Sequence, residues 1–173
     1  MSLISRLFGS RTDDHAAVRP LWHRIVEIAR EKRWYAELGL ADTVAGRFDA
    51  VTLVLSLVML RMERSPELAR PCVLLAELFV TDMDGQLRQS GVGDLVVGKH
   101  IGRLMSVLGG RLGAYRDGLA AAGNGELEAA LSRNLSLLES ADMVLLAQAV
   151  RGFADELAAT DDETLLAARM ASA

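Results

Sequence analysis

The chain contains few of the residues that build disulfide-bonded, metal-bound or strand-rich proteins. Its 173 residues include one cysteine, three histidines and three prolines. A single cysteine, Cys72, excludes an intramolecular disulfide framework and a zinc site built from cysteines. The histidines at positions 15, 23 and 100 are too few for a histidine-rich metal site. We therefore expect neither a bound metal nor another cofactor.

Long hydrophobic runs are also missing. The longest apolar stretch, Ala50–Leu60, has eleven residues, whereas a membrane-spanning helix needs about 20. A second stretch, Leu3–Phe8, is interrupted by Ser5 and Arg6 and is too short for the core of a signal peptide. It belongs either to a disordered tail or to a short element that touches a membrane. We expect a cytoplasmic protein.

The residues that are present favour one folded helical domain. Apolar residues make up 51% of the chain and charged residues 24%, which excludes a disordered protein. Ala, Leu, Glu and Arg dominate, and runs of β-branched residues are short, so strand signals are nearly absent. We predict an all-α, single-domain bundle of about six helices over residues 16–173. A flexible tail, residues 1–15, precedes it, and an acidic segment from Asp161 ends it.

Hydrophobic periodicity places the helices. It predicts helices over about 17–33, 46–64, 66–90 and 94–122, followed by one or two from about residue 126. The second is apolar on most sides, as expected for a helix at the centre of the domain. Trp22, Trp34 and Tyr35 are interpreted as core and edge anchors.

The net charge of −4 hides an uneven distribution. Residues 88–116 hold five basic residues and one acidic residue, whereas residues 117–173 hold three basic and ten acidic residues. A basic middle in an acidic protein indicates either a charged partner surface or an ordinary solvated helix face. Lys99, Arg103 and Arg111 are the candidates to contact anionic lipid, ribosomal RNA or acidic loops. No aromatic residues for base stacking lie between them, so we expect no sequence-specific nucleic-acid binding.

The fourth predicted helix carries two distinct stripes. At about 100° per residue, one side is apolar and is assigned to the core: Val97, Ile101, Leu104, Leu108, Leu112, Tyr115 and Leu119. Another side has almost no side chains: Gly98, Gly102, Ser106, Gly109 and Gly113. Because glycine weakens a helix, something should compensate for this stripe. It is either packed closely against a neighbouring helix of the same fold or forms a shallow groove for a partner helix.

The third predicted helix carries two carboxylates, Asp82 and Asp84. Their side chains point in directions too different for both to bind one metal ion. Residues two apart on a helix point about 200° away from each other. Asp84 can pair with Arg88 one turn later, or both carboxylates can contact a partner. Asp94 is expected to cap the following helix. No GxSxG nucleophile motif is present, and we assign no catalytic residue.

The order of these motifs resembles the ubiquinol–cytochrome c chaperone family of alphaproteobacteria and mitochondria. The resemblance covers about residues 20–150, and its most specific block runs from Asp82 to Lys99. The motifs that carry it are Asp82-Met83-Asp84, Leu87-Arg88, Gly91-Val92-Gly93-Asp94-Leu95, Val97-Gly98-Lys99 and Gly110-Arg111, with a weaker match at Asp42-Thr43 and Arg47-Phe48. Gly85, Gly109 and Gly113 depart from the family pattern.

The resemblance implies a non-enzymatic assembly factor that brings newly made cytochrome b into ubiquinol–cytochrome c reductase. The client it implies is a membrane protein. Mitochondrial members of the family work with a second small chaperone and near the ribosome exit, so a small co-chaperone and the ribosome are candidate partners here, but the resemblance does not carry them over to this chain. An anionic membrane surface is a further candidate because of the basic residues, and contact with it would make the protein peripheral at the inner membrane. We predict that a partner is bound by residues of the third and fourth helices: Asp82, Asp84, Arg88, Asp94, Gly98, Lys99, Gly102 and Arg103.

Two other classes of function stay open at this point. One is an interaction module whose basic face binds a ribosome or a membrane without holding a client. The other is a small helical enzyme that uses Asp82 and Asp84 with a divalent ion.

Overall fold

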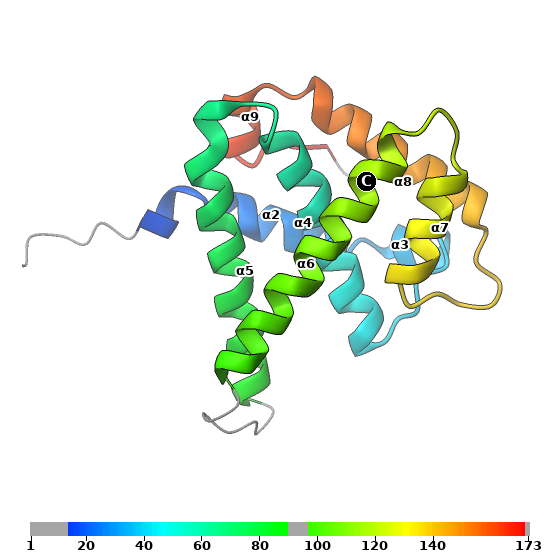
Figure 1. The fold of residues 1–173 in the computed structure, drawn as a ribbon, viewed down its shortest axis with the longest axis horizontal. Helices are drawn as coiled ribbons and strands as arrows, with labels where there is room; N and C mark the ends of the chain where they lie inside the picture. The colour runs from blue at the N-terminus through cyan, green and yellow to red at the C-terminus, as the bar shows by residue number, and fades with distance from the viewer. Residues whose placement is uncertain (1–13, 90–96, 172–173) are drawn as a thin grey trace, which may run out of the picture.

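The computed structural model describes residues 14–89 and 97–171, and these residues form an all-α bundle (Figure 1). In chain order, the elements are η1 (Asp14–Ala17), α2 (Arg19–Ala29), α3 (Lys32–Ala36), α4 (Val44–Met62), η2 (Pro66–Leu68), α5 (Ala69–Gln89), α6 (Val97–Ala120), α7 (Gly125–Asn134), α8 (Met143–Ala159) and α9 (Asp162–Leu166). The described residues contain no β-strand beyond an isolated bridge between Leu40 and Leu137. The predicted all-α, single-domain bundle is confirmed.

Helix α4 is the central element, as its sequence predicts. It begins two residues earlier than expected because the Thr43 hydroxyl accepts a hydrogen bond from the backbone N–H of Gly46. Every residue from Ala50 to Met59 is buried. The two hydroxyls in this stretch are satisfied within the helix: Thr52 donates to the Phe48 and Asp49 carbonyls, and Ser56 donates to Thr52. A helix with no exposed side in this stretch requires neighbours all around it.

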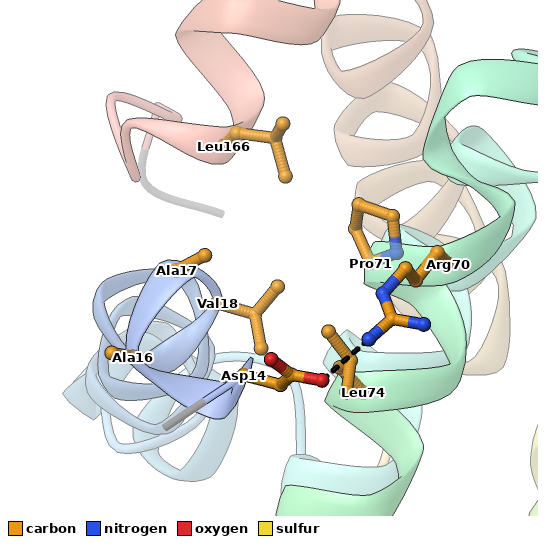
Figure 2. Close-up of a pocket in the computed structure, with 8 residues that line it drawn as sticks. All are labelled: Asp14, Ala16, Ala17, Val18, Arg70, Pro71, Leu74 and Leu166. Atoms are coloured by element: carbon orange, nitrogen blue, oxygen red, sulfur yellow. Dashed lines mark hydrogen bonds and ion pairs between the residues drawn. The ribbon is translucent and has the colours of Figure 1, made fainter. Parts of the chain in front are cut away.

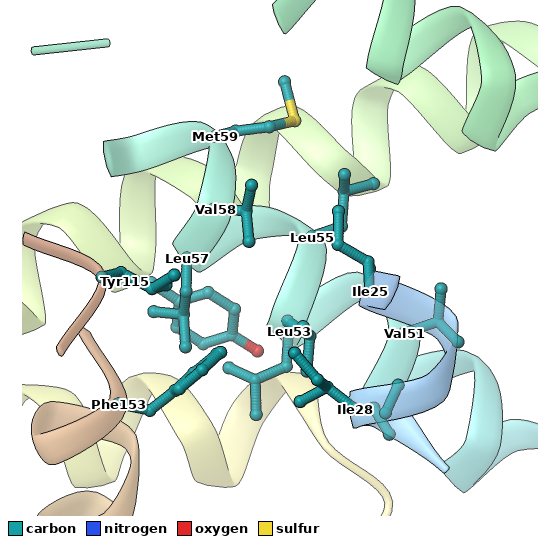
Figure 3. Packing of buried hydrophobic residues seen from close by; sticks show 14 of the residues in the cluster. Ile25, Ile28, Val51, Leu53, Leu55, Leu57, Val58, Met59, Tyr115 and Phe153 are labelled. Atoms are coloured by element: carbon teal, nitrogen blue, oxygen red, sulfur yellow. The ribbon is translucent and has the colours of Figure 1, made fainter. Parts of the chain in front are cut away.

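Side chains from three other helices close the core around α4 (Figure 3). Ile25 and Ile28 come from α2, Tyr115 from α6 and Phe153 from α8, and each is at most 3% exposed. The core therefore joins elements that are far apart along the chain. Among residues 14–89 and 97–171, no helix combines the length and apolar character needed to cross a lipid bilayer.

The first predicted helix is divided in two, which corrects the expectation of one helix over residues 17–33. Helix α2 ends at Ala29, and the short α3 begins at Lys32. Trp34 donates its indole N–H to the Ile28 carbonyl at 2.9 Å, and Tyr35 donates its hydroxyl to the Ala29 carbonyl at 2.7 Å. These bonds satisfy carbonyls at the end of α2, and the break turns Trp34 into the core, where it is 1% exposed.

The acidic C-terminal segment folds onto the bundle. Asp161 caps α9, and Asp162 pairs with Arg61 of α4 at 2.7 Å. Leu165 and Met170 are buried in the core. Of the predicted N-terminal tail, residues 14 and 15 belong to η1, whereas residues 1–13 lie outside the described residues.

Helices α5 and α6 form an antiparallel pair whose connection, residues 90–96, lies outside the described residues. Figure 1 shows the end of α5 and the start of α6 converging, at an end that extends past the rest of the bundle. Leu104, Leu108 and Tyr115 of α6 are buried as predicted, but Ile101 is 38% exposed. Ile101 was expected in the core. It lies near the extended end of the pair, where the bundle does not cover it.

One core residue carries a polar group that forms no hydrogen bond with the described residues. Tyr115 is fully buried, and within residues 14–89 and 97–171 its hydroxyl has no hydrogen-bond partner. Burial also raises the pKa of this phenol above its ordinary value, so it stays neutral. A buried polar group without a partner is destabilising by about 1–3 kcal/mol.

We expect Tyr115→Phe to stabilise the protein by about 1 kcal/mol, because it removes the unsatisfied hydroxyl and leaves the ring in place. In thermal unfolding, this corresponds to an increase in Tm of about 2–4 °C. The control is Tyr35→Phe, which removes a hydroxyl that donates at 2.7 Å and should lower Tm. A lower Tm for Tyr115→Phe would contradict the assignment.

Candidate functional site

Among residues 14–89 and 97–171, nothing packs closely against four glycines of α6. A Cβ atom built on any of four glycines would meet no neighbour within 4 Å: Gly102, Gly109, Gly110 and Gly113. Close packing inside the fold therefore does not explain these four residues. Gly118 shows the contrast, because a Cβ there would lie 2.7 Å from the Leu127 Cα of α7.

These glycines weaken the helix that carries them. Each costs about 0.5–1 kcal/mol relative to alanine, so four oppose α6 by about 2–4 kcal/mol. Alanine would fit at each position without a clash. No contact among the described residues requires glycine at these positions, and the helix backbone there is open to close approach by another chain.

We call Gly102, Met105, Ser106, Gly109 and Gly113 the glycine face. At about 100° per residue, these positions lie within about 100° of arc. Met105 is 45% exposed, and the neighbouring Ile101 is 38% exposed. The opposite edge carries the exposed Arg103. The face is therefore a strip of open backbone with an apolar rim on one side and a basic residue on the other.

A buried ion pair sets how α6 is rotated. Arg111 of α6 contacts Asp49 of α4, with 2.6 Å between Nη2 and Oδ1, and the two side chains are 11% and 9% exposed. Arg111 also donates to the Thr52 hydroxyl and lies with Cζ 5.5 Å from the centre of the Phe48 ring. The other Asp49 oxygen accepts hydrogen bonds from the backbone N–H and hydroxyl of Ser136. This cluster joins α4, α6 and the segment before α8.

The position of Arg111 corrects the prediction that it contacts an external anion. It is engaged inside the fold because Asp49, 62 residues earlier, places a carboxylate against it. Asp49 was not singled out in the sequence. The only available signal was a charged residue directly before the apolar run that starts at Ala50.

Seven of the eight predicted partner residues belong to helices α5 and α6. Asp82 of α5 accepts a hydrogen bond from the indole N–H of Trp22, and Asp84 is half-buried. Gly102 and Arg103 are exposed on α6. Arg88, Gly98 and Lys99 fall within α5 or α6, but their side-chain environments are not described, and Asp94 lies outside the described residues. Their role in partner binding stays a prediction.

Within residues 14–89 and 97–171, no three His, Cys, Asp or Glu side chains are grouped so that they could hold a metal ion. Two hollows lie away from the glycine face. The larger, of about 510 Å³, lies between η1, α5 and α9 (Figure 2) and is lined by Asp14, Ala16, Ala17, Val18, Arg70, Pro71, Leu74 and Leu166. The smaller, of about 310 Å³, lies between α3 and α8.

Comparison with known proteins identifies the family. The sequence model of the family described as "Ubiquinol-cytochrome C chaperone" matches residues 36–172. The chain belongs to the ubiquinol–cytochrome c chaperone family. The match extends through the acidic C-terminal segment, beyond the range of about 20–150 expected from the motifs.

A solved structure supports this assignment to the chaperone family. The crystal structure of the Cbp3 homolog from Brucella abortus matches with a TM-score of 0.80 and 33% sequence identity, and the alignment covers 99% of this chain and 97% of that chain. No curated protein sequence matches this chain. The bundle described above is therefore the fold of a ubiquinol–cytochrome c chaperone.

We expect Asp49→Ala to destabilise the protein by about 3–5 kcal/mol, because Arg111 is left buried without its counter-ion. Urea denaturation would measure the loss. Asp42→Ala is the matched control, since it breaks an exposed ion pair with Arg47 and should leave the midpoint nearly unchanged. Equal midpoints for both variants would show that the buried pair is not needed.

We expect Asp82→Ala to destabilise the protein by about 1 kcal/mol, because the N–H of the buried Trp22 loses its acceptor. Asp82→Asn keeps an acceptor oxygen and should retain most of the stability. Denaturation followed by tryptophan fluorescence would compare the two. If Asn and Ala are equally destabilising, Asp82 does not act through this hydrogen bond.

Proposed function

We propose that this chaperone binds newly made cytochrome b and supports its entry into ubiquinol–cytochrome c reductase. Family membership supports a role in the biogenesis of that complex. Cytochrome b is the client implied by the motif resemblance. It is a membrane protein, so its apolar helices need cover before they reach the bilayer. On this proposal the protein acts by binding, without a catalytic step.

The observation that supports a binding mechanism is the open glycine face. Small residues at four-residue intervals let two helix backbones approach closely, an arrangement common between membrane-spanning helices. Gly102 with Ser106, and Gly109 with Gly113, provide two such intervals within the face, and space is open around the three glycines. Ridges of this spacing pack at crossing angles of about −40 to −50°. A client helix with its own small residues would fit this geometry.

The rims of the face would orient the client. Ile101 and Met105 offer apolar contacts to a lipid-facing helix, and both are exposed enough to do so. Arg103 lies on the other edge and would attract acidic loops of the client or the anionic membrane surface next to it. Arg88 and Lys99 are predicted to extend this basic edge.

Two alternative functions receive less support. A purely charge-driven contact with ribosome or membrane would use the basic residues of segment 88–116. However, Arg111 is paired with Asp49 and Arg116 with Glu63, so two of its five positive charges are compensated within the fold. An enzyme using Asp82 and Asp84 would need both carboxylates at one site, but Asp82 is engaged by Trp22. A co-chaperone stays a prediction.

We expect Gly102→Leu and Gly109→Leu each to abolish capture of cytochrome b, because a leucine side chain fills the space that the client backbone would occupy. The helical circular dichroism should be unchanged, since nothing lies within 4 Å of either site. Co-purification of cytochrome b from cells expressing tagged variants would measure binding.

Gly152→Leu is the matched control for this experiment. Gly152 is an exposed helical glycine of α8 with equally open surroundings, but it lies outside the glycine face. It should retain cytochrome b. Normal capture by both α6 variants would rule out the glycine face, and equal loss in all three would show an effect of added leucine alone.

A further inference from the structure

The hollow between η1, α5 and α9 is built for apolar side chains. Its volume is about 510 Å³, and Figure 2 shows Val18, Leu74 and Leu166 pointing into it. Val18 lies between η1 and α2, whereas Leu74 belongs to α5 and Leu166 to α9. The charged groups at its edge, Asp14 and Arg70, are paired with each other. A charged ligand would therefore have to compete with this pair, whereas an aliphatic or aromatic side chain would not.

We propose that this hollow is the docking site of the chain's own N-terminal segment, Leu3–Phe8. Four of these six residues are apolar: Leu3, Ile4, Leu7 and Phe8. Burying them removes apolar surface from water, which is favourable. The proposal concerns a surface remote from the glycine face and does not depend on the identity of the client.

The length of the chain and the point where it enters the fold support this occupant. Residue 14 lies on the edge of the hollow, and Phe8 is only six residues earlier. A fully extended chain of that length spans at most about 22 Å, so Phe8 stays near the hollow. A segment tethered this closely has an effective concentration in the millimolar range, which favours it over a second copy of the protein.

Charge complementarity also supports the N-terminal segment as the occupant of the hollow. Residues 1–12 contain Arg6 and Arg11 and no acidic residue. Two exposed carboxylates lie near lining residues along the chain: Glu67, three residues before Arg70, and Glu163, three residues before Leu166. The segment can thus place its apolar side chains inward and its arginines towards acidic groups.

The test uses a spin label on the full chain. Cys72→Ala removes the native thiol, and Ser5→Cys places the label between the apolar residues without replacing any of them. We expect the methyl signals of Val18, Leu74 and Leu166 to lose most of their NMR intensity in the labelled protein. The double substitution Leu7→Asp/Phe8→Asp should restore these signals and leave the helical circular dichroism of residues 14–171 unchanged.

Two results would overturn the proposal. One is unchanged intensity of the three methyl signals when the label is present. The other is a loss that also appears when spin-labelled protein of natural isotope abundance is mixed with unlabelled, isotope-enriched protein, because that would assign the hollow to the segment of a second copy. A loss confined to the singly labelled chain and reversed by the two aspartates supports docking in cis.

Discussion

The rest of the structure depends on the buried ion pair between Asp49 and Arg111. Burying two charges is expensive, and the attraction between them offsets this only when their remaining hydrogen-bonding groups are also satisfied. Here the Thr52 hydroxyl and the Phe48 ring contact Arg111, and Ser136 donates to Asp49. Gly102 lies nine residues before Arg111, so at about 100° per residue it points about 180° away. Holding Arg111 in the core therefore turns the glycine face outward.

Contacts at the C-terminal end of α6 offset the destabilisation that its glycines cause. Arg151 of α8 donates to the carbonyls of Leu119 and Gly118 at 2.8 and 3.1 Å, which satisfies acceptors at the end of α6. Gly118 also allows α7 to approach closely through Leu127. The C-terminal part of α6 is thus anchored by α4, α7 and α8 and can hold in place the preceding part, which carries the glycine face.

Hydrophobic periodicity predicts which positions along one helix are buried. It does not predict contacts between segments that are far apart in the sequence. The apolar run of α4 predicts its central position, because a helix without a polar side must be surrounded. The same approach misplaces Arg111, since nothing nearby in the sequence marks Asp49 as its partner. The acidic C-terminal segment is another such case, because nothing nearby in the sequence marks Arg61 as the partner of Asp162 or Leu165 as a core residue. The glycine stripe is visible in the sequence, but only the fold shows which way it faces.

A glycine face is suited to binding that must be reversed. Contact through backbone atoms immobilises few side chains, so little conformational entropy is lost on binding. It also buries little apolar side-chain area apart from Ile101 and Met105, so the affinity stays moderate. A client helix held in this way can be released to the bilayer or to the next subunit, where more apolar surface is covered. A deep apolar groove would bind the same helix more tightly, and release from it would be slower.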